Sequence, residues 1–209
     1  MLSLSLFCSS QTISVAIFEK QKLKKIYKKN IFDNRIEGIF EILEKCLLNF
    51  DLKKLSYIYL CNGPGSFTAL RSLKSISQAI AISSGAKIIF VTSFAPFFTF
   101  QRNEEEILVC FEGTKKTLFY QFFKKKKLMF FPSEDLNFGK EEHFIKFYEE
   151  KKLANKNLIL ITSYEFEKMN INEPKIYFKE IDASNITRAI FLGYGLKDDK
   201  IHYHNTYYE

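Results

Sequence analysis

A glycine-rich turn between an apolar strand and a long helix limits the folds open to this chain. The stretch LSYIYLC, residues 55–61, is short and apolar and predicts a buried strand. The sequence NGPGS follows it, and helical spacing then runs from about Phe67 to Ser84 before Gly85. Gly63 and Gly65 permit a tight turn, and Gly85 is typical of a helix end. A strand, a turn and a helix in this order favour an α/β fold with mixed sheets.

The residues before this turn predict three strands and a helix. The segments LSLSLFC (2–8), QTISVAIFEK (11–20) and KLKKIYKKN (22–30) are strand-like, and their short links predict an antiparallel meander. Residues 34–50 have helical spacing, with Asp33 or Asn34 as the N-cap. We expect one apolar stripe on this helix, formed by Ile36, Ile39, Phe40, Leu43, Leu47 and Phe50. After residue 85, AKIIFVTS predicts a strand and FAPFFTFQ a short helix or turn.

The second half repeats the change from strands to helices. The segments ILVCFEG, KTLFYQFF and KLMFFP predict a second meander, followed by a helix at about 140–153 and strands NLILITS and KIYFKE. Residues 184–196 predict a C-terminal helix capped by Ser184 or Asn185. We therefore expect an N-terminal lobe, 1–100, on which the helix 184–196 can pack back, and a smaller C-terminal lobe, 101–209.

Composition restricts the class of protein and its compartment. An apolar fraction of 46% over 209 residues predicts a folded core rather than disorder. The net charge of +7 permits an acidic partner such as RNA, although arginine, the usual phosphate reader, is scarce. The start of the chain lacks the basic region of a signal peptide, and no stretch reaches the ~20 apolar residues of a membrane span. We expect a cytoplasmic protein with buried free thiols at Cys8, Cys46, Cys61 and Cys110.

The turn at 61–68 allows three interpretations from physical chemistry alone. It is a structural turn, a loop that binds an anion at the helix N-terminus, or a catalytic element. The spacing of a P-loop and its terminal Lys-Ser/Thr are missing, as is the third glycine of a dinucleotide fingerprint. The helix that follows is rich in small residues, which suit either internal packing or a subunit interface, namely Ala69, Ser72, Ser75, Ser77, Ala79, Ala81 and Ser83.

Side chains that could carry out catalysis are few. His143 lies in a charged helix, whereas His202 and His204 share one face of a tail without partners at metal-ligand spacing. Cys61 has no nearby histidine, and no serine-nucleophile motif occurs. The lysine run FKKKKL (123–128) predicts a hairpin turn rather than a dedicated RNA surface. We therefore expect no catalytic residue and no metal.

The segment GPGSFTALR, residues 63–71, resembles the TsaB (YeaZ) family of bacterial proteins. That family has GPGSFTGLR here, so eight of nine positions match and Ala69 replaces a glycine. The order of elements over residues 1–100 agrees as well, and EPKIYFKEID is similar to a later family motif. The resemblance implies an actin-like ASKHA fold of two lobes. It also implies a role in forming N6-threonylcarbamoyladenosine at position 37 of tRNAs that read ANN codons.

In such a complex the family member is the non-catalytic partner of the catalytic paralogue TsaD. The resemblance implies a dimer with a TsaD-type protein, or a homodimer when the chain is alone, together with a TsaE-type small ATPase and tRNA bound through the complex. It implies that the partner interface uses the turn and the following helix: Gly63, Pro64, Gly65, Ser66, Phe67, Thr68, Arg71, Ser72, Ser75 and Ala79. ATP or ADP at the junction with the catalytic subunit would contact Gly63, Gly65 and Ser66.

This chain departs from the family where kinase-like chemistry would need acidic groups. The first strand ends LFCSS, so Phe7 or Cys8 replaces the family's aspartate. The segment CFEGTKKTLFYQ lacks an Asp and an Arg of the second lobe and offers Glu112 and Lys115 or Lys116 instead. These departures favour a scaffold subunit over an enzyme. An ATP-dependent enzyme of the same fold and a peptidase-like protein are the alternatives.

Overall fold

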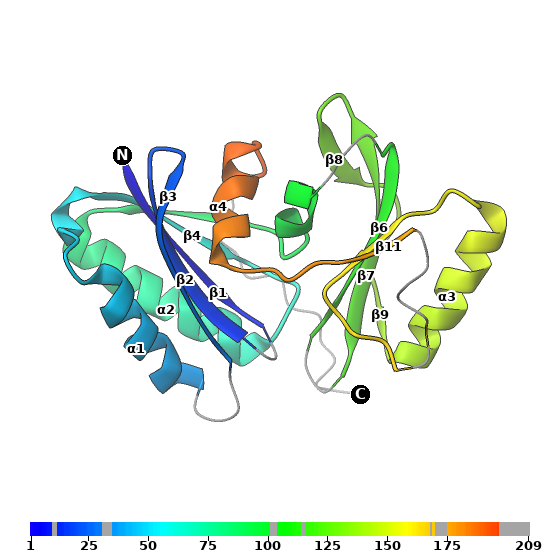
Figure 1. Cartoon of the computed structure of the whole chain (residues 1–209), viewed down its shortest axis with the longest axis horizontal. Helices are drawn as coiled ribbons and strands as arrows, with labels where there is room; N and C mark the ends of the chain where they lie inside the picture. The colour runs from blue at the N-terminus through cyan, green and yellow to red at the C-terminus, as the bar shows by residue number, and fades with distance from the viewer. Residues whose placement is uncertain are drawn as a thin grey trace. The chain divides into compact units, whose positions relative to one another are not determined.

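The computed structural model describes residues 1–9, 12–30, 35–100, 104–113, 116–167, 169 and 175–196. The chain forms two compact units (Figure 1), one of residues 1–99 with the segment from Asp182 onward, and one of residues Phe100–Ile181. The second unit therefore ends at Ile181, whereas the expected lobe ran to residue 209. The predicted cap residues Asp33 and Asn34, and the tail with His202 and His204, lie outside the described residues.

The first unit contains a five-stranded mixed sheet in the order β3-β2-β1-β4-β5. Its first three strands form the predicted antiparallel meander, and β4 and β5 run parallel to β1. Their bounds are β1 (Leu2–Cys8), β2 (Thr12–Glu19), β3 (Lys22–Asn30), β4 (Leu55–Cys61) and β5 (Lys87–Val91). β1 lies between β2 and β4, and residues 3–6 of its LSLSL repeat are buried on both faces of the sheet, which helices cover.

Two helices cover one face of this sheet, α1 (Arg35–Leu47) and α2 (Phe67–Ser84) (Figure 1). Leu4 and Leu6 of β1 share a core with Ile39 of α1 and Leu73 of α2. The predicted stripe on α1 was wrong at one position, because Phe40 is 56% exposed. Instead Ile42 and Cys46 face the sheet, since they lie one turn apart on the side that also presents Ile39. The helix ends at Leu47, three residues before the predicted end.

The helix α4 (Ala183–Phe191) packs on the opposite face of the same sheet. There the serines of β1 and β2 meet its first turn. Ser5 Oγ donates to Ala183 O at 2.6 Å, and Ala183 N donates to Ser14 Oγ at 2.8 Å. The Thr187 and Ser5 hydroxyls are 3.0 Å apart. The alternation of LSLSL thus directs leucines to α1 and α2 and serines to α4.

The predicted limits of this last helix were wrong at both ends. Asp182 is the N-cap, because its carboxylate accepts from Ser184 N while Asn185 reaches back to Asp182 N. The helix ends at Phe191 rather than 196. Gly193 has a φ of 96°, and Leu196 N then donates to Phe90 O at 2.7 Å. The chain therefore leaves the helix to form an isolated bridge with β5.

The second unit has a mixed sheet in the order β11-β10-β6-β7-β8, with β9 also paired to β7. The predicted meander is confirmed as antiparallel pairing of β6, β7 and β8. The strands are β6 (Glu106–Glu112), β7 (Leu118–Lys126), β8 (Met129–Pro132), β9 (Asn137–Gly139), β10 (Leu160–Thr162) and β11 (Ile176–Phe178).

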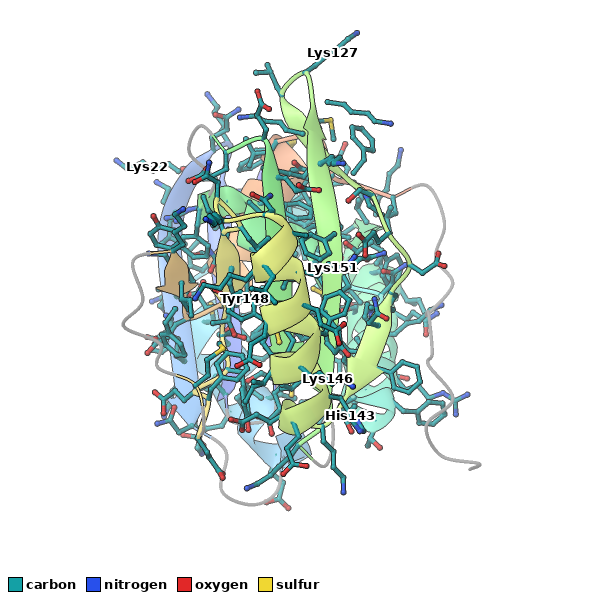
Figure 2. All side chains as sticks on the ribbon, turned by 90° about the vertical axis from the view of Figure 1, so that its right-hand side faces the viewer. Lys22, Lys127, His143, Lys146, Tyr148 and Lys151 are labelled. Atoms are coloured by element: carbon teal, nitrogen blue, oxygen red, sulfur yellow. The ribbon has the colours of Figure 1, made fainter. Side chains whose placement is uncertain are left out.

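One helix, α3 (Glu141–Ala154), covers a face of this second sheet (Figure 2). Phe144 and Tyr148 are buried there, and Phe144 stacks on Phe166 with ring centroids 5.1 Å apart. Before this unit, η2 (Ala95–Phe100) is the short helix expected from FAPFFTFQ. Across the described ranges, every helix is too short or too polar to cross a membrane.

Candidate functional site

The glycine-rich turn is fixed to the end of β5 by backbone hydrogen bonds. Asn62 N donates to Val91 O at 2.9 Å, and Ser93 N donates to Gly63 O at 2.8 Å. Gly63 has a φ of 117°, a conformation that side-chain-bearing residues rarely adopt. The Gly63–Pro64 peptide bond is cis, and Pro64 is buried. The two backbone hydrogen bonds therefore attach the turn to the end of β5, and α2 begins four residues after Gly63.

The second glycine of the turn has no such backbone requirement. A Cβ atom built on Gly65 would lie 3.7 Å from Leu70 Cδ1 and 4.0 Å from Ser93 Oγ, which are ordinary contacts. The next residue, Ser66, is the N-cap of α2, and its hydroxyl accepts from Ala69 N at 3.5 Å. Gly85 ends the helix with a φ of 76°.

The helix α2 has a buried face and an exposed face of small and polar residues. Leu70, Leu73 and Ser77 are buried toward the sheet, so one of the small residues serves internal packing. Ser72 is half-buried. The exposed face consists of Thr68, Arg71, Ser75, Gln78, Ala79 and Ile82. We call these six residues the α2 outer face.

Phe67 and Arg71 form a pair at the start of this face. The Arg71 guanidinium carbon lies 4.0 Å from the centroid of the Phe67 ring, which is cation–π distance. Phe67 is half-buried, whereas Leu70 is buried. Arg71 is itself exposed, and the exposed positions of α2 continue from it to Ser75, Gln78, Ala79 and Ile82.

The three buried cysteines are poorly suited to nucleophilic chemistry. Burial raises the pKa of the Cys61 thiol to about 12, although a hydrogen bond with Ser93 lowers it in part. Burial also raises the pKa of Cys46 to about 11 and that of Cys110 well above its usual value. Thiols with such pKa values remain protonated at neutral pH, and the thiolate is the nucleophile.

The end of β1 shows what replaces the acidic loop of a kinase-like site. Ser9 N donates to Thr12 O at 2.8 Å, and Thr12 N donates to Ser9 Oγ at 3.0 Å. The two side chains thus hold the turn between β1 and β2. Within the residues that the structure describes, no group of three His, Cys, Asp or Glu side chains could hold a metal ion.

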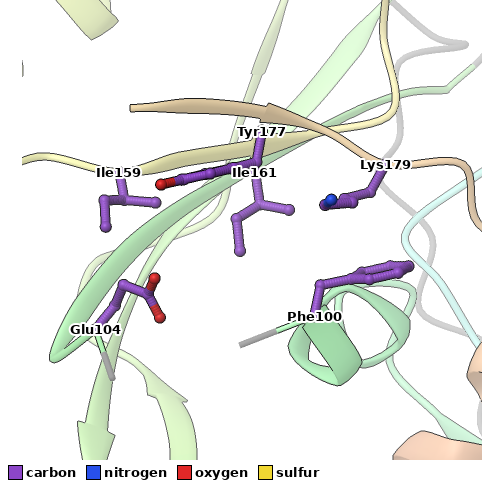
Figure 3. Close-up of a pocket in the computed structure, with 6 residues that line it drawn as sticks. All are labelled: Phe100, Glu104, Ile159, Ile161, Tyr177 and Lys179. Carbon is purple, nitrogen blue, oxygen red and sulfur yellow. The ribbon is translucent and has the colours of Figure 1, made fainter. Parts of the chain in front are cut away.

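A cavity of about 160 Å³ lies within the second unit (Figure 3) and was not anticipated from the sequence. Ile159 and Ile161 form an apolar wall, and the charged groups of Glu104 and Lys179 both point toward the space. The Lys179 ammonium lies 5.6 Å from the centroid of the Phe100 ring, and Tyr177 completes the lining. These residues come from separate segments, so no local motif marks the cavity.

The sequence of the chain is similar to a known protein family and to a named relative. A model of the family described as "TsaD: tRNA N6-adenosine threonylcarbamoyltransferase" matches residues 32–199. The tRNA threonylcarbamoyladenosine biosynthesis protein TsaB of Buchnera aphidicola is 30% identical over 130 residues. That alignment covers 59% of this chain and 58% of the Buchnera protein. The chain thus spans less than two thirds of this curated relative in the alignment.

Two solved structures from Pseudomonas aeruginosa have the same fold. One is described as an uncharacterized protein with similarity to peptidase YeaZ. It aligns with a TM-score of 0.68 at 11% identity, covering 96% of this chain and 98% of that one. The other is YeaZ, with a TM-score of 0.65 at 13% identity and 91% of both chains covered.

The chain has two units, each a mixed sheet with helices, and it shares its fold with the two YeaZ-like structures. Its fold is therefore of the α/β class and of the actin-like ASKHA type. The family model matches residues 32–199, and the Buchnera relative is a TsaB protein, so the family can be named as well as the fold. The chain belongs to the TsaD family and, within it, to the TsaB (YeaZ) group.

Proposed function

We propose that this chain takes part in the biosynthesis of threonylcarbamoyladenosine in tRNA as the non-catalytic partner of a TsaD-type catalytic protein. The target is adenosine 37 of tRNAs that read ANN codons, and a TsaE-type ATPase joins the complex. The relative from Buchnera aphidicola is a tRNA threonylcarbamoyladenosine biosynthesis protein, and this supports the proposed pathway. The geometry of the first unit supports the role of a partner subunit.

The α2 outer face is the observation that carries this proposal. Ile82 is 87% exposed, and Ala79 and Ser75 lie beside it within two helical turns. Small residues let a second helix approach closely, and burying the Ile82 side chain would contribute about 1.5–3 kcal/mol to the contact. Backbone hydrogen bonds at Asn62 and Gly63 attach the turn that precedes this helix to the end of β5. We therefore place the partner, or a second copy of the chain when the partner is absent, on this face.

The side chains near the turn support a scaffold rather than an enzyme. Cys61 has a pKa of about 12 because it is buried, and Ser66 is occupied as a helix cap. The end of β1 has Phe7 or Cys8 where the family has an aspartate, and the next residue, Ser9, hydrogen-bonds with Thr12. A nucleotide at the junction between subunits remains a secondary proposal. It would contact the backbone at Gly63 and Gly65 and the Ser66 hydroxyl, with the acidic groups supplied by the partner.

A single substitution on the α2 outer face tests the interface. Ala79→Arg adds a long charged side chain at an exposed position, so the fold should be unaffected. Overpacking a tight contact costs about 1–3 kcal/mol, and burying an unpaired charge costs more. We expect the Kd of the variant for the TsaD-type protein to rise tenfold or more, which is enough to dissociate a micromolar complex. Light scattering of the mixture and circular dichroism of the variant measure the two quantities.

Ala154→Arg is the matched control, because Ala154 is an exposed residue at the end of α3 in the second unit. It makes the same chemical change on a surface that the proposal does not use. Wild-type affinity of a folded Ala79→Arg variant would place the interface elsewhere, as would an equal loss in both variants.

A further inference from the structure

We infer that the hairpin between β7 and β8, where the sequence alone predicted only a turn, contacts the phosphate backbone and a base of tRNA. The inference rests on the proposed function, since tRNA is the polyanion that this function brings to the chain. Four lysines, Lys124–Lys127, stand in a row at the hairpin, and residues 123–133 contain no acidic side chain. Figure 2 shows Lys127 at the tip, pointing away from the sheet and from α3.

The positive charge at the tip is not neutralised within the described part of the chain. Lys124 lies 3.4 Å from Glu106 Oε1, and the Lys125 ammonium lies 5.9 Å from the centroid of the Phe130 ring. Lys126 and Lys127 are exposed, and neither forms an ion pair with a described residue. Two unpaired ammonium groups on adjacent residues suit contacts with successive phosphates, which displace bound counterions.

The strand register adds an aromatic side chain to the same face as the lysines. Lys124 is paired with Phe131, and Lys126 with Met129. Directly opposed residues of an antiparallel pair lie on one face, and so do residues two apart along a strand. Phe131 is 42% exposed, although it is a large apolar side chain on a charged hairpin. A base unstacked from RNA would cover this ring, while Lys124 and Lys126 hold the backbone beside it.

The β2–β3 hairpin resembles the β7–β8 hairpin in its turn but differs from it in charge. The β2–β3 turn also has two residues and also begins with a lysine at positive φ, 54° at Lys20 against 59° at Lys127. Its closing pair is Glu19 with Lys22, and Glu19 also pairs with Lys24 at 2.8 Å. That turn therefore carries its own carboxylate. The two turns have the same length and a similar φ at their first residue. Variants of the β2–β3 hairpin therefore control for the loss of lysine charge by itself.

The test measures binding of an unmodified tRNA transcript to the full-length chain by fluorescence anisotropy over a series of salt concentrations. Lys126→Gln with Lys127→Gln should lower the slope of log K against log salt by about 1.4–1.8 and weaken binding at about 50 mM salt on the order of tenfold per lysine. Lys20→Gln with Lys22→Gln makes the same charge change and should alter the slope by far less. Equal effects of the two double variants, or no effect of either, would overturn the inference.

A third variant separates stacking from charge. Phe131→Leu keeps an apolar residue but removes the aromatic face, so it should weaken tRNA binding between about fivefold and a hundredfold and leave the salt slope unchanged. Unchanged affinity would remove the base contact from the inference. All hairpin variants should bind the TsaD-type protein as the wild type does. A hairpin variant that no longer binds the TsaD-type protein would show that the hairpin contacts a protein partner instead. A hairpin variant that loses only tRNA binding would leave the result of the Ala79→Arg test on α2 unchanged.

Discussion

At the scale of single residues, the two glycines of the turn look equivalent in the sequence but differ in the structure. Gly63 has a φ of 117°, whereas Gly65 lacks a positive φ and has room for a Cβ atom at 3.7 Å from Leu70. The motif thus combines one glycine that the backbone requires and one that it does not. We infer that Gly65 is available for close approach of another molecule rather than needed for folding.

Alanine substitutions at the two positions should therefore have different effects. Gly63→Ala forces an L side chain into a strained conformation, and we expect it to lower the free energy of unfolding by about 1–3 kcal/mol. Gly65→Ala should be neutral or stabilise by up to about 1 kcal/mol, because it removes freedom from the unfolded chain. Urea denaturation of both variants measures the difference. An equal loss of stability in the two variants would contradict this account of the turn.

At the scale of elements, α4 depends on a charged cap at its first turn. Asp182 accepts from Ser184 N at 2.8 Å and pairs with Lys28 Nζ at 2.5 Å. Burial raises the pKa of Asp182, but hydrogen bonds from Lys28 and Ser184 outweigh it, so the net pKa lies below the ordinary value of 3.8. A folded-state pKa below the unfolded one stabilises the folded protein above about pH 4, and this contribution is lost as the pH falls through the folded pKa.

Removing this charge should have a pH-dependent effect. We expect Asp182→Asn to lower the free energy of unfolding by about 1 kcal/mol at pH 7. The difference from the wild type should shrink from pH 7 toward pH 3, as the pH falls through the lowered pKa of Asp182 in the folded state. Glu19→Gln is the control, because its bridge to Lys24 is solvent-exposed and should contribute nothing measurable. Denaturant curves at the two pH values test this, and a difference that stays constant with pH would contradict it.

The elements also show how far a single sequence predicts a structure. Alternation in LSLSLFC and spacing in the segment before Gly85 located β1 and α2, because each pattern reflects burial on a fixed face. The sequence did not identify Asp182 as the cap of α4, because Ser184 and Asn185 are equally good cap residues by type. It placed Phe40 in the core because only tertiary packing determines which of two adjacent apolar residues faces the sheet.

At the scale of the whole molecule, the fold was predictable and part of the site was not. The motif at 63–71 identified the family, and the order of strands and helices agrees with it. The exposure of Ala79 and Ile82 follows from helix geometry once the buried face is known. The cavity beside Lys179 and the face shared by Lys126 and Phe131 depend on strand pairing across distant segments, which local patterns do not contain.

Reconstitution of tRNA modification tests the central claim most directly. A TsaD-type protein, its TsaE-type ATPase, a source of the threonylcarbamoyl group and an unmodified ANN-reading tRNA are combined with or without this chain, and modified adenosine 37 is measured by mass spectrometry. We predict that the chain alone forms no product, that the TsaD-type protein needs the chain for full activity, and that Ala79→Arg abolishes this stimulation while Ala154→Arg does not. Product formation by the chain alone, or a TsaD-type protein equally active without it, would contradict the account.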